Sequence, residues 1–200
     1  MSIKLLVAFY SRNGTVESLA KAVGEGAVAE GAELRLRRAR EFVSAEVMAK
    51  APGWTENAAR MNALYEAPSE ADAEWADAIV FGTPTRFGCV SAELKAYVDS
   101  LGGLWAQGRL AGKVGSVFSA TSSLHGGNET TIMSLYPPLA HLGFIIVPLG
   151  YSDPALFKAG TPYGATAATG RDRRPITDDE RAVAHYQGQR VARVAAKLRG

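Results

Sequence analysis

Five short apolar runs alternate with helix-like segments along this chain, and that alternation limits the fold more than any other feature of the sequence. The runs lie at residues 3–9, 33–37, 78–81, 114–118 and 144–148, and each is bounded by glycine, proline or polar residues, as β-strands are. The first, third and fourth are continuously apolar, which is typical of strands in a parallel sheet covered on both faces. Five βα repeats predict an α/β three-layer sandwich: a five-stranded parallel sheet of order 2-1-3-4-5 with helices on both faces.

The segments between the runs carry apolar residues three and four positions apart, which is the spacing of amphipathic helices. Pro137 and Pro138 interrupt one such stripe, so we expect that helix to kink or to restart there. Thr177 followed by Glu180 has the form of a capping box and predicts a long final helix that extends to Leu198.

The chain has 200 residues, 47% of them hydrophobic, and no repeat or linker divides it, so we predict a single domain over residues 1–200. Two insertions, at about residues 41–67 and 151–176, are longer than ordinary connections. The first carries large apolar or aromatic side chains that would be costly to expose, and we expect it to be an oligomer contact. These side chains are Trp54, Met61, Leu64 and Tyr65.

Composition excludes several classes of protein. No apolar run approaches the roughly 20 residues that cross a bilayer, and the N-terminus lacks the pattern of a signal peptide. These two absences favour a cytoplasmic protein without membrane insertion. The single cysteine, Cys89, cannot form an intramolecular disulfide, which agrees with a reducing compartment. The formal net charge is only +2, and acidic residues lie among the arginine clusters at residues 35–40 and 171–174. We interpret both clusters as solvated surface and predict no nucleic-acid binding.

Three loops at the predicted carboxyl ends of strands are rich in hydroxyl and glycine residues. In an open parallel sheet, ligands bind at this edge, near the point where the strand order reverses. The loops read SRNGTV at residues 11–16, TPTRFG at residues 83–88 and SATSSLHGG at residues 119–127. Their hydroxyls and backbone N–H groups, with an apolar wall from Phe87 or Trp105, suit a planar heterocycle with a phosphate tail, such as flavin mononucleotide (FMN).

The first of these loops opens directly into a helix, whose free N–H groups and dipole favour an anion. Ser11 and Thr15 supply hydroxyls and Gly14 allows close approach, so the loop is either a phosphate cradle or a plain turn in which Ser11 or Thr15 caps the helix. Neither GxxxxGK[ST] nor GxGxxG follows the first run, which argues against P-loop and Rossmann nucleotide sites. The acidic residues that a phosphorylated receiver domain needs are also missing from the ends of the first and third runs.

Three stretches, GTPTRFG, GGLW and GTPYGA, are highly specific in combination, and SRNGTVESLAKAV, HGGNETT, LAHLGFIIVPLGY and HYQGQRVA accompany them. In this order, over nearly the entire chain, they resemble the WrbA family of NAD(P)H:quinone oxidoreductases, within the flavodoxin-like superfamily. The resemblance implies a flavodoxin-like fold, noncovalent FMN, and a homotetramer, or else a dimer, in which neighbouring subunits complete each active site. It also implies two-electron reduction of quinones to hydroquinones by NADH or NADPH, in a ping-pong cycle of hydride transfer through flavin N5.

Matching positions carry the site of that family onto this chain. Loop 11–16 would hold the phosphate, and the other two loops would surround the ribityl chain and the ring. Trp105 would line the pocket above the ring, Asn13 would meet the nicotinamide nucleotide, and His141 would reach a flavin pocket across a subunit boundary. The flavin supplies the chemistry, so no catalytic residue and no metal ligand is assigned. The predicted cofactor-binding residues are Ser11, Arg12, Asn13, Gly14, Thr15, Val16, Pro84, Thr85, Arg86, Phe87, Gly88, Ser119, Ala120, Thr121, Ser122, Ser123, Leu124, Gly126, Gly127 and His141.

Two other functions remain open from the sequence. A single-electron carrier would normally be strongly acidic, whereas this chain is slightly basic. A noncatalytic scaffold would not need three hydroxyl-rich loops at one edge of the sheet. Cys89, beside the second loop, has no evident basic partner, and we expect a small buried residue rather than a reactive thiol.

Overall fold

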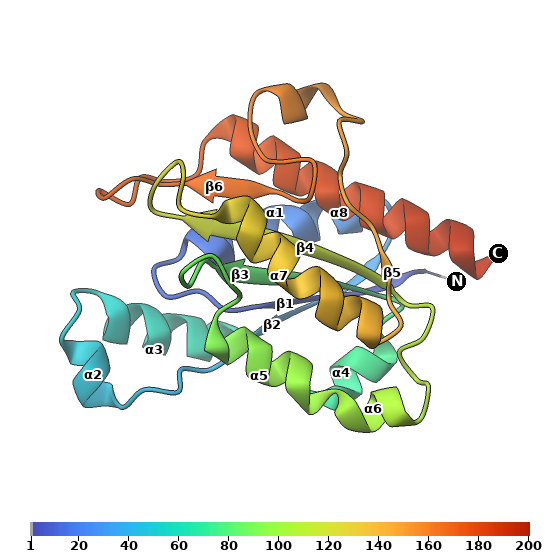
Figure 1. The fold of residues 1–200 in the computed structure, drawn as a ribbon, viewed down its shortest axis with the longest axis horizontal. Helices are drawn as coiled ribbons and strands as arrows, with labels where there is room; N and C mark the ends of the chain where they lie inside the picture. The colour runs from blue at the N-terminus through green and yellow to red at the C-terminus, as the bar shows by residue number, and fades with distance from the viewer. Residues whose placement is uncertain (1) are drawn as a thin grey trace.

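The computed structural model describes residues 2–200 and contains a parallel β-sheet between two layers of helices (Figure 1). The strand order is β2-β1-β3-β4-β5, and every pair is parallel, as predicted. The order reverses between β1 and β3. The strands are β1 (Lys4–Phe9), β2 (Glu33–Arg38), β3 (Ala78–Pro84), β4 (Val114–Thr121), β5 (Ile145–Ile146) and β6 (Thr166–Ala168).

Alternate residues of the central strands point into two separate hydrophobic cores. In β1, Leu5 and Val7 pack under α1 (Thr15–Ala29) and α8 (Asp178–Arg199), whereas Leu6 faces the opposite layer. That opposite layer consists of α4 (Glu70–Trp75), α5 (Ala92–Ser100), α6 (Gly102–Ala106) and α7 (Asn128–His141). No helix within residues 2–200 has both the length and the apolar character to span a membrane.

Two short strands share the edge position beside β4, and the second of them was not predicted. β5 pairs with Val114 and Gly115 at the start of β4, and β6 pairs with residues 119–121 at its end. Between them the chain leaves the sheet, forms the 3-10 helix η1 (Pro154–Phe157) and returns (Figure 1). The insertion at residues 151–176, the second insertion, therefore extends the sheet and brings the loop after β6 to the carboxyl edge of β4.

Of the two alternatives predicted at Pro137 and Pro138, a kink or a restart, the restart does not occur, because α7 continues through both prolines. Leu135 and Leu139, on either side of the prolines, are fully buried against the sheet. Tertiary packing thus maintains a helix that its local sequence disfavours. The final helix begins as predicted, at a capping box formed by Thr177 and Glu180.

The insertion at residues 41–67, the first insertion, folds into α2 (Ala45–Ala49) and α3 (Trp54–Leu64). Trp54 and Met61 are buried within the chain, and the Tyr65 ring packs edge-on against Phe9 with 5.3 Å between the ring centroids. Of the four side chains expected at an oligomer contact, only Leu64 is exposed. The burial of the other three needs no second copy of the chain.

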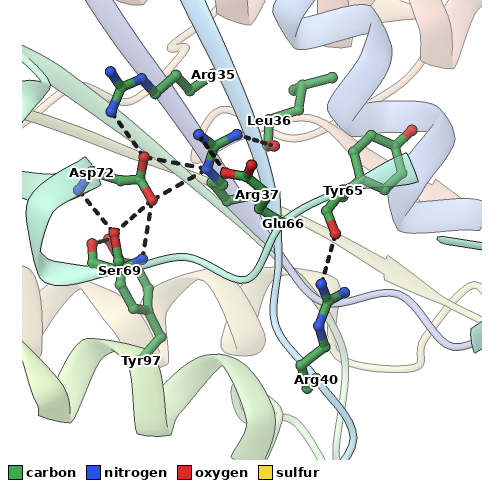
Figure 2. A network of polar contacts seen from close by, with 9 residues as sticks. All are labelled: Arg35, Leu36, Arg37, Arg40, Tyr65, Glu66, Ser69, Asp72 and Tyr97. Carbon is green, nitrogen blue, oxygen red and sulfur yellow. Dashed lines mark hydrogen bonds and ion pairs between the residues drawn. The ribbon is translucent and has the colours of Figure 1, made fainter. Parts of the chain in front are cut away.

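The arginines of β2 are structural rather than solvated, contrary to the interpretation from sequence. Arg35 and Arg37 both form ion pairs with Asp72 of α4, at 3.0 and 3.2 Å (Figure 2). Asp72 also closes the capping box of α4 with Ser69. Burial alone would raise the pKa of Asp72, but hydrogen bonds from Ser69 and from both arginines hold it below its ordinary value. This network ties the edge strand to α4.

α1 and α8 meet in direct backbone contact at a glycine of each helix. A Cβ on Gly188 would lie 1.8 Å from the carbonyl oxygen of Val23, and a Cβ on Gly26 would lie 1.9 Å from that of His185. Because the obstacle is backbone, no side chain can rotate to make room. The spacing of this helical layer therefore depends on both glycines.

Replacing Gly188 with alanine is expected to push α8 away from α1 and to lower the free energy of unfolding by about 2 kcal/mol, the usual cost of overpacking. Gly102→Ala is the matched control, because a Cβ there meets no atom within 4 Å. Denaturant titration measures both variants. If G188A were as stable as the wild type, the helices would not be held at this spacing.

Candidate functional site

A cavity of about 370 Å³, the first cavity, opens at the carboxyl edge of the sheet, beside the point where the strand order reverses. Its volume lies within the range of small-molecule and cofactor sites, about 300–1,000 Å³. Its walls come from the carboxyl ends of β3 and β4 and from the loops after β1, β3, β4 and β6. The lining residues are Ser11, Arg12, Asn13, Thr15, Val16, Pro84, Thr85, Arg86, Ala120, Thr121, Ser122, Thr169, Gly170, Arg171 and Arg173.

The loop after β1 leaves the N-terminus of α1 without a side-chain cap. Gly14 precedes the helix with a φ of 91°, a left-handed conformation that favours glycine. The Ser11 hydroxyl accepts a hydrogen bond from Gly14 N–H at 3.1 Å, and so it shapes the loop instead of capping the helix. Of the two alternatives that the sequence left open, this geometry fits an anion cradle better than a capped turn.

A buried arginine that sequence reasoning missed supports this loop. Arg38, at the end of β2, is 0% exposed and donates a hydrogen bond to Ser11 O at 2.9 Å. It also donates to Asn62 Oδ1 at 2.6 Å and forms an ion pair with Glu41. The expectation of a solvated residue is wrong for Arg38. The burial of Arg38 could have been predicted from the alternation of side chains along β2, because Arg38 lies on the same face of the strand as the core-facing Leu34 and Leu36.

The first insertion contacts the same loop through Arg12 and the first turn of α1 through Glu17. The Arg12 guanidinium stacks on the Trp54 ring, 3.7 Å from its centroid. Glu17, in the first turn of α1, accepts hydrogen bonds from Arg60 and Tyr65, both at 2.9 Å. Burial alone would raise the pKa of Glu17, but these hydrogen bonds hold it below its ordinary value. The insertion thus forms a wall behind the anion cradle.

The loop after β3 forms a tight turn that projects Phe87 into solvent. Arg86 and Cys89 exchange backbone hydrogen bonds of 2.9 and 3.1 Å, and the residues between them, Phe87 and Gly88, have φ values of 54° and 80°. Thr85 lines the cavity, and its hydroxyl accepts a hydrogen bond from Gly88 N–H at 3.1 Å. Cys89 is exposed because the turn ends outside the core, so the expectation of a buried cysteine is wrong.

The end of β4 and the loop after it line the cavity with Ala120, Thr121 and Ser122. At its two ends, Ser119 Oγ and Asn128 Oδ1 are buried and have no hydrogen-bond partner among residues 2–200. Neither residue lines the first cavity, so these unpaired atoms are not assigned to its ligand.

A fourth loop, after β6, completes the cavity and was not predicted as part of the site. Glu180 anchors it, accepting hydrogen bonds from Ala168 N–H at 3.2 Å and from Arg174 at 2.8 Å. Because only the pairing of β6 with β4 brings this loop to the sheet edge, no local sequence pattern reveals it. Its lining residues are Thr169, Gly170, Arg171 and Arg173.

The first cavity brings together predicted residues from all three predicted loops, but several others do not line it. Gly14, Gly88 and Gly127 have positive φ and shape the turns, while Ser119 is buried. The predicted cofactor-binding residues outside the lining are Gly14, Phe87, Gly88, Ser119, Ser123, Leu124, Gly126, Gly127 and His141.

Trp105 and His141 line a second cavity, of about 210 Å³, together with residues of α5 and α7. The loop after β4 leads into the N-terminus of α7, whereas His141 ends this 14-residue helix, about 20 Å away. Within one chain, these two side chains therefore do not reach the first cavity.

The arginines of the first cavity lack carboxylate partners. Among residues 2–200, none of Arg12, Arg86, Arg171 and Arg173 forms an ion pair. Burial, together with the positive charges of Arg86 and Arg173, lowers the pKa of the Arg12 guanidinium. A phosphate group supplies negative charge and several acceptor oxygens, so these residues and the uncapped helix fit the phosphate of FMN.

A doubly wound sheet of this strand order, with an anion cradle after the first strand, defines a flavodoxin-like protein. The chain belongs to the NADPH-dependent FMN reductase family (FMN_red), whose model matches residues 1–153. The loop after β6 lies beyond the matched segment.

Solved structures agree with this assignment. The chain is similar to a WrbA-like flavodoxin from Agrobacterium tumefaciens, with 26% identity and a TM-score of 0.68 over 98% of this chain and 99% of that one. A flavodoxin from the domain Archaea (14% identity, TM-score 0.63, 97% and 99% covered) and flavodoxin 2 from Bacillus cereus (17%, 0.60, 96% and 99%) share the fold. The chain is thus a member of the FMN-dependent reductases with a flavodoxin-like fold.

Replacing Phe87 with asparagine is expected to raise the free energy of unfolding by up to about 1 kcal/mol. A left-handed backbone costs most residues about 1–2 kcal/mol, and asparagine tolerates it better. The fully exposed ring loses no packing when it is removed. Phe42→Asn is the control, because Phe42 is also exposed but has no positive φ. Thermal denaturation compares the two, and a less stable F87N variant would show that the turn is not strained.

Glu17 is expected to stabilise the fold in a pH-dependent way. Its folded-state pKa is depressed, so its contribution is present above the unfolded-state pKa of about 4.3 and is lost as the pH falls through the lower folded-state value. The stability difference between the wild type and Glu17→Gln should be largest near neutral pH and shrink in acid. Glu56→Gln, at an exposed position of α3, is the control. A difference that does not change with pH would contradict the assigned ion pairing.

Proposed function

We propose that this protein is a WrbA-type, single-domain, cytoplasmic NAD(P)H:quinone oxidoreductase that uses FMN to reduce quinones to hydroquinones. The observation that carries the proposal is the first cavity, where an uncapped helix N-terminus and unpaired arginines face the edge at which the strand order reverses. The similarity to a WrbA-like protein over 98% of the chain supports it. Bound FMN would supply ping-pong hydride transfer at N5, with NAD(P)H and a proton converting a quinone to a hydroquinone and NAD(P)⁺.

The residues of this chain bind and orient in the proposal, and none reacts covalently. Ser11 and Thr15, with the first N–H groups of α1, would hold the phosphate. Thr85 and Thr121 would flank the flavin from the two central loops. Asn13, exposed at the mouth of the cavity, would meet the nicotinamide nucleotide.

Trp105 and His141 enter the proposal through a neighbouring subunit. Trp105 is 57% exposed and stands beside His141 at the second cavity, far from the first cavity of the same chain. In a homotetramer, or at least a dimer, the second cavity of one subunit would cover the flavin of its neighbour and form an aromatic wall for flat substrates.

The test of the proposal is an assay of the purified protein loaded with FMN. Oxidation of NADH or NADPH should require an added quinone, and double-reciprocal plots at several quinone concentrations should be parallel, as a ping-pong cycle demands. Protein that binds FMN but oxidises neither nucleotide with any quinone would refute the activity. Intersecting lines would refute the ping-pong order alone.

Trp105→Ala is expected to lower kcat/KM for quinone by up to about tenfold, the loss expected when a stacking wall is removed, while leaving FMN affinity unchanged. Mixing W105A with Gly14→Asp, which places a carboxylate in the anion cradle, should restore activity, because hybrid oligomers then contain one intact composite site. Wild-type mixed with G14D is the reference for subunit exchange. Failure of complementation despite exchange would place Trp105 outside the active site.

A further inference from the structure

Arg12 differs from the other cavity arginines in being held by a distant part of the chain. Its guanidinium carbon lies 3.7 Å from the centroid of the Trp54 ring, and Trp54 is only 8% exposed at the start of α3. Arg12 Nε and Trp54 Nε1 are both buried and have no hydrogen-bond partner among residues 2–200. Stacking, and not hydrogen bonding, therefore fixes the orientation of this guanidinium.

Hydrogen bonds hold α3, and with it Trp54, in place beside the anion cradle. Arg60 of α3 donates hydrogen bonds to Glu17 in the first turn of α1, and Asn62 of α3 accepts one from Arg38. Arg38 in turn donates to the carbonyl of Ser11 in the loop after β1. α3 is thus connected to both sides of the anion cradle, and Trp54 has little freedom to move relative to it.

The charge on Arg12 is not neutralised within the described chain. It takes part in no ion pair there, and Arg86 and Arg173 add positive charge nearby. An arginine stacked on an aromatic face keeps the edge of its fork available for phosphate oxygens. Preorganising that edge reduces the entropy lost when a phosphate binds.

We propose that Trp54 is a positioning residue that holds Arg12 against the phosphate of the flavin and so makes the site select FMN over riboflavin, which lacks the phosphate. The inference rests on the proposed FMN site. It assigns the first insertion to cofactor recognition, through a contact between Trp54 and Arg12.

The test measures dissociation constants for FMN and riboflavin by quenching of flavin fluorescence. Trp54→Leu, which keeps apolar bulk but removes the ring, and Arg12→Gln should each weaken FMN about tenfold, the effect of losing one charge-assisted contact, with riboflavin affinity unchanged. Trp54→Phe keeps an aromatic face and should behave as the wild type. Leu64→Ala is the control for disturbance of α3, because Leu64 lies on the same helix and is exposed.

The double variant W54L/R12Q should bind FMN no more weakly than R12Q alone, because Trp54 acts only through Arg12. Wild-type FMN affinity in W54L, equal losses for both flavins, or additive losses in the double variant would each overturn the inference. If riboflavin binds too weakly to measure, the FMN affinities of W54L and L64A are compared instead, and equal affinities would overturn the inference. A wild-type protein that binds no FMN would instead refute the proposed function.

Discussion

The candidate site depends on the parallel register of β1, β3 and β4, which brings their carboxyl ends to one level. Phe9 pairs with Gly82 and Thr83 pairs with Ser119, so three loops begin side by side. Gly82 has a particular reason to be glycine, because a Cβ there would lie 2.2 Å from the Phe118 ring of the neighbouring strand. The register of the sheet thus determines where the first cavity lies, independently of the contacts between the loops.

The arginines around this edge fall into two groups, those that form ion pairs with a carboxylate and those that do not. Outside the cavity, Arg38 pairs with Glu41, Arg60 with Glu17, and Arg174 with Glu180, so each supports a wall. The arginines that line the cavity have no such carboxylate partners in residues 2–200. In the Arg38–Glu41 pair both side chains are buried, and removing one partner of such a pair is strongly destabilising, so this pair must stay fixed. The unpaired group is left to bind an anion.

The sequence predicted the sheet because β1, β3 and β4 are continuous apolar runs, a strong and local signal. It also predicted three of the loops that line the first cavity, since each directly follows such a run. β6 was missed because its three residues, TAA, have no strand signal of their own and pair only with the end of β4. Trp54 was misjudged because its burial comes from long-range contacts that the residues near it in sequence do not reveal. For Arg38, the alternation of β2 was a local signal, but its hydrogen bond to Ser11 is a long-range contact.

The two insertions explain how a common fold acquires a particular site. Strands β1 to β5 and the loops after β1, β3 and β4 lie within the segment that matches the family, whereas β6, Arg171 and Arg173 follow it in sequence. The first insertion supplies Trp54 behind Arg12, and the second supplies the loop after β6. The second insertion therefore adds positive charge to the carboxyl edge of the sheet, and the first orients a positive charge that is already there. Because backbone geometry sets the position and the insertions contribute to the electrostatics, the selectivity of this site can change without any change in the sheet.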